Sequence, residues 1–300
     1  MIPLFFLNDY TIPLGSFDHH LHGSVVTEFE QEFCKYVGAP YGCAISSATN
    51  AIFLLLLDKK TKISIPSMLP AVVANSVINS GNSIEFEDNT SWVGHSYTLH
   101  ENIIDSAQRV DKNQYANESK KGEVMFFSFY PTKPVGGIDG GIVVSDDKEL
   151  IDWIREASMN GMSYSSNSWE REQKFAGWKM YMSSSQAYVA LNNLRKLDDK
   201  KKRIKEVRDQ YNKAFNLTNT SEHLYRVSTG HREQALAALK EKGIVCGVHY
   251  KPLHQTRLFP SSEDLPISEA EGSTTLSIPL HEGLSDSETQ YIIKCVGETL

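Results

Sequence analysis

The sequence predicts an α/β protein in which helices cover a mainly parallel sheet, with a smaller α+β part at the C-terminal end. Strand-like apolar runs alternate with helical patterns through the first half of the chain. A long helical pattern then precedes a mixed set of strands and helices. Because 300 residues can bury more than one core, we predict a large domain at residues 1–190 and a connector helix with a small domain at residues 191–300.

The composition bounds the class of protein. Hydrophobic residues make up 40% of the chain and charged residues 22%, which is ordinary for a globular protein. The formal net charge of −7 disfavours a nucleic-acid partner, because binding to phosphates relies on clustered positive charge. The four cysteines form no C-x-x-C pair, and the chain carries neither a signal-peptide pattern nor a bilayer-length apolar run. We therefore expect a cytoplasmic protein with free thiols, no metal site and no membrane contact.

The first half of the chain alternates between the two kinds of element. Residues 1–22 lack a regular period and predict an irregular arm. An apolar stripe at helical spacing predicts a helix that begins at Ser24 and is capped by Gly38. The elements expected next are a strand at 42–45, a helix at 51–57, a strand at 62–65, a helix at 70–79, a strand at 83–87 and a strand at 102–104. This alternation is typical of a mainly parallel sheet.

The second half changes character after a paired set of strands. Strands at 124–129 and 141–144 flank a turn rich in Pro and Gly, and a helix at 148–157 and a polar loop at 160–173 follow. A helical pattern from Ser185 to Phe215 is long enough to connect two domains, with a break expected near Asp198. The remaining expected elements are a strand at 224–227, a helix at 232–242, and strands at 244–250 and 275–278 before a helix at 285–296.

Three different chemical groups follow the ends of predicted strands. One strand stops at Ser46–Thr49 and the chain restarts as a helix, which leaves free N–H groups that can bind an anion. Simple N-capping by Ser47 or Thr49 explains the same residues and is compatible with anion binding. Asp105 ends another strand, and Lys133 lies in the turn after a third. Because ligands of open α/β sheets bind at the carboxyl ends of strands, we expect these groups to converge.

An amine, an anion site and a carboxylate together suit pyridoxal phosphate. A lysine forms a Schiff base with its aldehyde, a helix N-terminus holds its phosphate, and a carboxylate keeps its ring nitrogen protonated. Burial should lower the pKa of Lys133, so that its amine can act as a base near neutral pH. Judged by residue type alone, Lys133 would instead be a solvated loop residue.

Four segments, in this order, resemble the motifs of the DegT/DnrJ/StrS sugar aminotransferases. They are Ile104–Gln108, Phe127–Lys133 with Asp139–Gly141, Gly177–Ser183 and Val248–His254. The resemblance covers about residues 29–291, nearly the whole chain. It implies the aspartate aminotransferase fold, also called fold type I, and pyridoxal 5′-phosphate as the cofactor, with pyridoxamine phosphate as its intermediate form.

The resemblance also implies roles for individual residues. Lys133 would be the Schiff-base lysine and proton shuttle, Asp105 the partner of the pyridine nitrogen, and Gln108 a neighbour of the ring hydroxyl. The other cofactor-binding residues implied are Ser47, Ala48, Thr49, Pro70, Ser128 and Lys179. Because the segment that holds Lys179 reaches into the partner's site in this family, a homodimer with shared sites is expected.

The expected substrate is a nucleotide-linked keto-deoxyhexose, with L-glutamate as the amino donor. Residues expected to face it are Tyr130, His249, Tyr250 and His254. Without the resemblance, the two histidines would be read as satisfied loop or core residues. The segment 249–254 resembles the branch that forms 4-amino sugars from 4-keto-6-deoxy acceptors. A related branch of sugar dehydratases has histidine in place of the lysine, so Lys133 favours amino transfer.

The sequence departs from the family pattern at several positions. Pro70 stands where the family places an aromatic ring against the cofactor, and Ala48 stands where the family usually has glycine. Lys179 takes the place of a common asparagine. The interval from Glu87 to Asn102 is a few tens of residues shorter than in a typical member. The shortened interval and Pro70 keep open a non-catalytic or regulatory relative. Another enzyme on the same cofactor, such as a sugar dehydratase or an amino-acid aminotransferase, also stays open.

Overall fold

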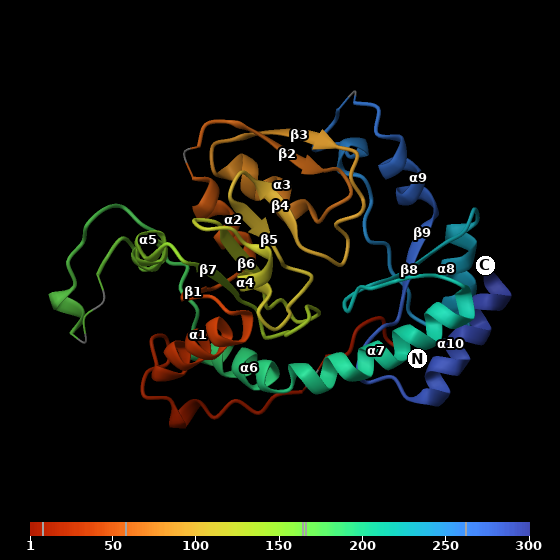
Figure 1. Cartoon of the computed structure of the whole chain (residues 1–300), viewed down its shortest axis with the longest axis horizontal. Coiled ribbons are helices and arrows are strands. Elements are labelled where there is room, and N and C mark those ends of the chain that lie inside the picture. The colour runs from red at the N-terminus through yellow and green to blue at the C-terminus, as the bar shows by residue number, and fades with distance from the viewer. Residues whose placement is uncertain (8, 58, 164, 166, 262) are drawn as a thin grey trace.

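The computed structural model describes residues 1–7, 9–57, 59–163, 165, 167–261 and 263–300. A five-stranded sheet with the order β1-β7-β6-β5-β4 lies at its centre (Figure 1). Its strands are β1 (Tyr41–Ile45), β4 (Tyr97–His100), β5 (Ile103–Asp105), β6 (Val124–Ser128) and β7 (Gly141–Ser145). Helices cover both of its faces, so the predicted α/β class is confirmed.

The strand directions differ from the mainly parallel sheet that the sequence predicts. In the central sheet only β5 and β6 pair in parallel, whereas β1–β7, β6–β7 and β4–β5 are antiparallel. The sheet is therefore mixed. The cause is local: β6 and β7 follow each other across the turn at 129–140, and β4 and β5 across residues 101–102, so each pair folds back on itself.

A second, two-stranded sheet lies beside the first. It pairs β2 (Lys62–Pro66) in parallel with β3 (Ser83–Glu87). The helix α3 (Ala71–Asn79) connects these strands, and α2 (Ala48–Leu56) joins β1 to β2. This β-α-β unit is the one that the alternation in the sequence predicts.

The strand β6 shows why both faces of the central sheet are covered. Val124 and Phe126 point into a cluster with α2 and α5 (Lys148–Ser158). Met125 and Phe127 point into another cluster with α1 (Ser24–Val37) and α6 (Ser184–Arg195). Successive strand residues face opposite sides of a sheet, so a strand of buried apolar residues needs a helical layer on each side.

A long helix leads from the sheet to the C-terminal part of the chain (Figure 1). The predicted break lies at Lys196, between α6 and α7 (Leu197–Phe215). The elements that follow are β8 (Tyr225–Ser228), α8 (Arg232–Glu241), α9 (Pro266–Thr274), β9 (Thr275–Ile278) and α10 (Asp286–Thr299). The buried residues of a third apolar cluster all lie between residues 204 and 296, and Ile2 packs against them. The division into domains near residue 190 stays a prediction.

The predicted strand at 244–250 is wrong. The segment forms only single bridges, from Ile244 to Ile2 and from Gly247 to Ser277. The chain then leaves the small sheet, so that His249 and Tyr250 reach the edge of the central sheet instead of extending a ladder. The sequence patterns also missed β4, α9 and the short helix α4 (Gln114–Glu118). Single turns of 3₁₀ helix occur at Leu14–Ser16, Ser168–Glu170 and Leu253–Gln255.

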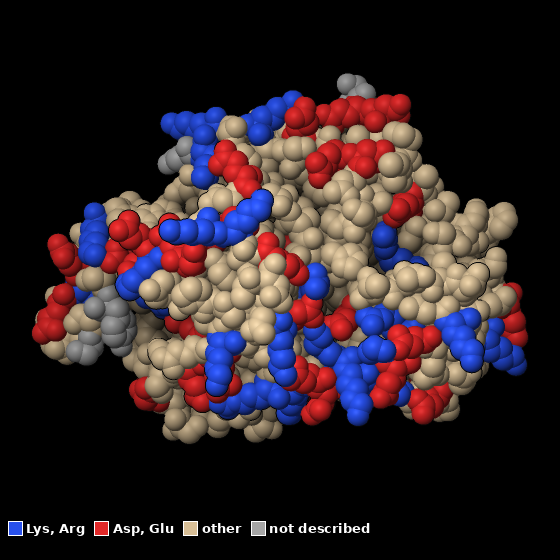
Figure 2. All heavy atoms as spheres, viewed as in Figure 1, with Lys and Arg blue, Asp and Glu red and all other residues tan. Residues whose placement is uncertain are grey.

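The surface mixes both signs of charge. Figure 2 shows basic and acidic side chains interspersed over the visible face. Several are paired, as in the ion pair between Arg203 and Asp286 that links α7 to α10. Within the part of the chain that the structure describes, no helix is both long and apolar enough to cross a bilayer.

Candidate active site

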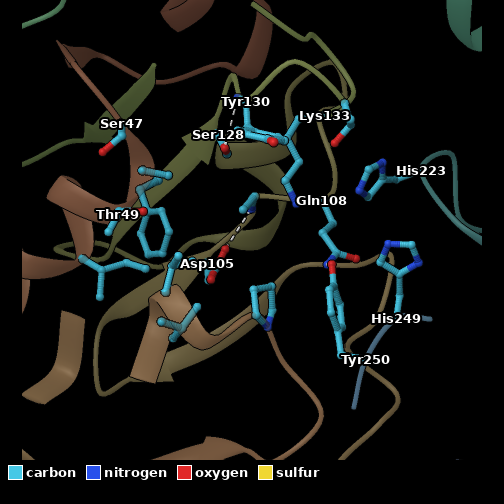
Figure 3. Close-up of a pocket in the computed structure, with 18 of the residues that line it drawn as sticks. Ser47, Thr49, Asp105, Gln108, Ser128, Tyr130, Lys133, His223, His249 and Tyr250 are labelled. Atoms are coloured by element: carbon cyan, nitrogen blue, oxygen red, sulfur yellow. Dashed lines mark hydrogen bonds between the residues drawn. The ribbon is translucent and has the colours of Figure 1, made fainter. Parts of the chain in front are cut away.

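A cavity of about 680 Å³ opens where β1, β5 and β6 end. It brings together every residue predicted for the site except Lys179 and His254. The predicted residues that line it are Ser47, Ala48, Thr49, Pro70, Asp105, Gln108, Ser128, Tyr130, Lys133, His249 and Tyr250. Figure 3 shows Ser47 and Thr49 on one side of this space and His223, His249 and Tyr250 on the other, with Lys133 and Asp105 pointing into it.

The start of α2 forms one end of the cavity. Ser47 caps this helix, because its Oγ accepts a hydrogen bond from the N–H of Asn50 at 3.2 Å. The N–H groups of Ala48 and Thr49 lie in the first turn, where a helix offers them no carbonyl. Gly141 packs directly against this turn: a Cβ there would lie 2.7 Å from the nitrogen of Ala48. The capping hydrogen bond leaves these two N–H groups free of helix partners, and the positive end of the helix dipole faces the cavity.

Lys133 enters the cavity from the turn after β6. Its backbone N–H donates to the carbonyl of Tyr130 at 2.9 Å, which fixes the turn. Gly136 has a φ of +68°, and a Cβ there would lie 2.9 Å from the carbonyl oxygen of Pro131, so the turn requires glycine. Burial lowers the pKa of Lys133 to about 8, although the charge of Asp105 opposes this shift. The amine therefore loses its proton more readily than an exposed lysine does.

Asp105 faces Lys133 across the cavity from the end of β5. Its side chain is buried, and its Oδ1 accepts a hydrogen bond from the N–H of Ala107 at 2.8 Å. The Tyr97 hydroxyl donates to Oδ2 at 3.2 Å. Burial raises the pKa of Asp105 to about 6, while the N–H of Ala107, the charge of Lys133 and the hydroxyl of Tyr97 oppose the shift. At neutral pH the carboxylate is therefore mainly ionised and can pair with a buried cation.

A hydrogen-bonded set of side chains closes the other end of the cavity. The Gln108 amide nitrogen donates to the Tyr250 hydroxyl at 2.9 Å, and its amide oxygen accepts from the N–H of Gly94 at 2.7 Å. Nδ1 of His249 lies 2.9 Å from Oγ of Ser277. Burial, more than the charge of Lys133, lowers the pKa of His249 to about 4, so this imidazole is neutral at neutral pH. These groups present hydrogen-bonding atoms without net charge.

Two predicted site residues lie outside the cavity. His254 is buried, with Nδ1 2.6 Å from Oγ of Ser67 and Nε2 3.0 Å from a carboxylate oxygen of Glu269. This arrangement matches the reading of a satisfied core histidine. Lys179 is exposed and follows the chain that extends away from the sheet after α5 (Figure 1). Its expected contact with a partner's cofactor stays a prediction.

The cavity also contains residues that sequence patterns did not single out. Phe5, from the irregular arm, stacks on His223 with ring centroids 5.5 Å apart. Burial, reinforced by the charge of Lys133, lowers the pKa of His223 well below its usual value. Trp92 and Tyr97 come from the short interval before Asp105. Two large aromatic residues in that polar interval were a signal, but nothing in the local pattern indicated where they point.

The family model of the DegT/DnrJ/EryC1/StrS aminotransferases matches residues 15–91 and 103–297. The chain belongs to this family. The stretch 92–102 remains unmatched, and it is the stretch that supplies Trp92 and Tyr97. The shortened interval that the sequence indicates therefore coincides with the part of this DegT-family protein that the family model does not cover.

Named relatives of this DegT-family chain resemble it over most of their length. The spore coat polysaccharide biosynthesis protein SpsC of Bacillus subtilis is 28% identical over 346 positions, which cover 91% of this chain and 89% of SpsC. The UDP-4-amino-4,6-dideoxy-N-acetyl-beta-L-altrosamine transaminase of Campylobacter jejuni is 25% identical over 332 positions, covering 90% and 88%. Among solved structures, the PLP form of the putative sugar aminotransferase Spr1654 of Streptococcus pneumoniae has a TM-score of 0.80, with 20% identity and 99% of each chain covered. This last similarity shows the shared fold.

Proposed function

We propose that this protein is a pyridoxal-phosphate-dependent aminotransferase that moves the amino group of L-glutamate onto the ketone of a nucleotide-linked keto-deoxyhexose. The observation that carries the proposal is that an amine, a carboxylate and a helix N-terminus converge in one cavity. They belong to Lys133, Asp105 and the start of α2, respectively. In the overall exchange, glutamate becomes 2-oxoglutarate, and the ketone of the sugar becomes an amine. The acceptor that we favour is a 4-keto-6-deoxy sugar.

The residues present fit this cofactor. The first turn of α2 offers the unpaired N–H groups of Ala48 and Thr49 to a phosphate, and the Ser128 hydroxyl lines the same cavity. The Asp105 carboxylate would pair with a protonated ring nitrogen. Pyridoxal phosphate, when bound, supplies an aldehyde that carries the amino group and a ring that takes up electrons.

Lys133 would hold the cofactor through its amine and then move protons at the substrate carbon. Its lowered pKa suits both tasks, because the amine must be unprotonated to attack an aldehyde and to accept a proton. Asp105 would keep the ring nitrogen charged, because a buried carboxylate interacts more strongly with a neighbouring cation than an exposed one does. No other lysine lines the cavity among the described residues, so Lys133 is the candidate for both roles.

The pH dependence of cofactor capture tests the state of Lys133. With a pKa of about 8, roughly a tenth of the amine is unprotonated at pH 7, compared with roughly 3 in 10,000 for an ordinary lysine. Because the pKa is lowered, the unprotonated fraction of the amine rises at a lower pH than it does for an ordinary lysine. The rate at which the cofactor-free protein captures pyridoxal phosphate should therefore increase with pH, with a midpoint near pH 8, as followed by stopped-flow absorbance. N-acetyl-lysine amide is the control, and a midpoint for the protein as high as that of this compound would contradict the expectation.

The cavity suits a nucleotide-sugar acceptor in size and chemistry. Its volume of about 680 Å³ lies within the range of small-molecule sites. Tyr130, which is 55% exposed, lies at the rim, and His249 and Tyr250 offer neutral polar groups. The name of the Campylobacter jejuni relative supports a UDP-linked 4-amino sugar as the kind of product.

The proposal includes a homodimer with shared sites. Lys179 is exposed, forms a single bridge with Met159 just after α5, and lies outside the cavity of its own protomer. We propose that it neutralises the cofactor phosphate in the partner's site, as the family resemblance implies.

Adding glutamate to the purified, cofactor-loaded protein is the direct test. The yellow absorption should disappear within one half-reaction, with formation of one 2-oxoglutarate for each protomer, and return when a nucleotide-linked 4-keto-6-deoxyhexose is added. Mass spectrometry of the sugar then separates amination from dehydration. A protein that binds pyridoxal phosphate but responds to no amino donor would support a non-catalytic relative. A protein that takes up no pyridoxal phosphate would refute the proposed function.

A further inference from the structure

The stretch 92–97 forms one wall of the cavity. Trp92 and Tyr97 line it, and their rings contact each other with centroids 5.1 Å apart. This stretch belongs to the interval that the family model leaves unmatched. Its contribution to the cavity is therefore a feature of this chain that the family match does not explain.

Trp92 has the properties of a side chain that receives a ligand. It is 5% exposed, and its ring is nearly parallel to that of Tyr250, with an interplanar angle of 8° and centroids 5.9 Å apart. Its indole Nε1 is buried and has no hydrogen-bond partner among the described residues. A buried N–H without an acceptor costs free energy, and an acceptor atom on a bound molecule would remove that cost.

Tyr97 acts on the carboxylate that faces the cavity. Its hydroxyl donates to Oδ2 of Asp105, while the N–H of Ala107 holds Oδ1. Both oxygens of Asp105 are thus held by donors from different segments, which fixes the plane of the carboxylate. Burial raises the pKa of Tyr97 well above its usual value, so the hydroxyl remains a donor over the working pH range.

Contacts with other segments of the chain hold this wall of the cavity in place. Gly94 donates its N–H to Gln108, and a Cβ at Gly94 would lie 2.4 Å from Oγ of Ser221, so the backbone passes close to the C-terminal part. Thr90, two residues before Trp92, donates to a carboxylate oxygen of Glu271 at 2.7 Å. These contacts tie the stretch to both halves of the chain and keep its aromatic rings in position.

We infer that this stretch supplies the aromatic stacking that Pro70 cannot provide: Trp92 offers the aromatic surface for the bound ring, and Tyr97 positions Asp105 against the ring nitrogen. The inference rests on the proposed cofactor. Pro70, at the start of α3, also lines the cavity but has no π-system, so it cannot provide aromatic stacking. Trp92 acts by direct contact, whereas Tyr97 acts through Asp105 and is a positioning residue.

The two roles predict different responses to two probes. One probe is pyridoxal phosphate, and the other is its 1-deaza analogue, in which carbon replaces the ring nitrogen. Trp92→Ala should weaken the binding of both probes by about tenfold, because both have the same ring face. Trp92→Phe should restore most of the affinity, since it keeps an aromatic surface. Tyr97→Phe should weaken only pyridoxal phosphate, by about tenfold, because the analogue has no nitrogen for Asp105 to pair with.

Equilibrium dialysis on the cofactor-free protein measures these affinities without relying on turnover. Matched controls are Tyr115→Phe, which removes a buried hydroxyl 3.3 Å from Asp146 outside the cavity, and Trp153→Ala, which removes an indole that packs on Phe175. Both should bind the two probes like the unaltered protein. Equal losses for the two probes in Tyr97→Phe would mean a merely structural effect and would overturn its role.

The outcomes also separate this inference from the proposed function. If the unaltered protein binds pyridoxal phosphate and the Trp92 and Tyr97 variants bind it equally well, the inference fails and the proposed function stands. If the unaltered protein does not bind pyridoxal phosphate at all, both fail. A retained affinity in Trp92→Ala together with a loss in Tyr97→Phe would overturn the role of Trp92 alone.

Discussion

Replacing Lys133 with alanine is expected to abolish amino transfer and to remove the visible absorption of the bound cofactor. The side chain is the one amine among the described residues that line the cavity, so nothing replaces it as the covalent anchor or as the proton carrier. Loss of a nucleophile that also moves protons costs at least about 10⁴-fold in turnover. Absorbance spectra and steady-state assays with glutamate and a nucleotide-linked keto sugar measure the two effects.

Two further variants make this result specific. Lys133→Arg keeps a positive charge but has no amine that can attack an aldehyde, so it should be as inactive as Lys133→Ala. Lys121→Ala, at an exposed position away from the cavity, should behave like the unaltered protein. Circular dichroism verifies that each variant is folded. Substantial turnover in a folded Lys133→Ala variant would show that another group does the chemistry.

Replacing Asp105 with asparagine should lower turnover by about 10²- to 10³-fold while leaving the fold intact. Asparagine has nearly the same shape, and its amide oxygen can still accept from Ala107 or Tyr97. It carries no charge, however, so it cannot keep a ring nitrogen protonated in a buried site. Single-turnover kinetics of the glutamate half-reaction isolate this effect from the binding of the sugar.

Asp111→Asn is the matched control for this prediction. Asp111 is a half-buried carboxylate that pairs with Arg109 and Lys201 outside the cavity. Loss of the Asp111 carboxylate should lower the free energy of unfolding more than it lowers turnover. If Asp105→Asn and Asp111→Asn reduce turnover by similar factors, the effect of Asp105 is structural, and its proposed role with the ring nitrogen is wrong.

The parts of the site that were predictable from sequence come from short-range rules. Ser47 and Thr49 mark a helix start because a capped first turn is a property of a few consecutive residues. Asp105 and Lys133 end strands or follow them, and the topology of a sheet brings such ends to one edge. The turn that holds Lys133 is also set by nearby residues, because its backbone conformation requires Gly136.

Other features depended on contacts between distant segments. His254 belongs to a segment that resembles a family motif. Its side chain is nevertheless held in the interior by Ser67 and Glu269, which are distant from it in sequence. The segment at 244–250 has the composition of a strand, but it pairs only singly with Ile2 and Ser277 before it turns toward the cavity. A hydrophobic pattern in the sequence predicts which residues are buried, but it does not predict which segments pack against them.

Lys133 illustrates what the sequence and the tertiary structure each determine about the site. The sequence alone established that a lysine follows a buried strand within a family motif, and that a carboxylate and a helix start follow neighbouring strands. Only the tertiary structure decided that the amine lies in a buried cavity opposite Asp105, and that Trp92 and Tyr97 form the wall beside them. The physical reason is that strand ends and helix caps arise from local backbone geometry. Burial, altered pKa values and a wall built from an irregular stretch arise from packing between segments far apart in the chain.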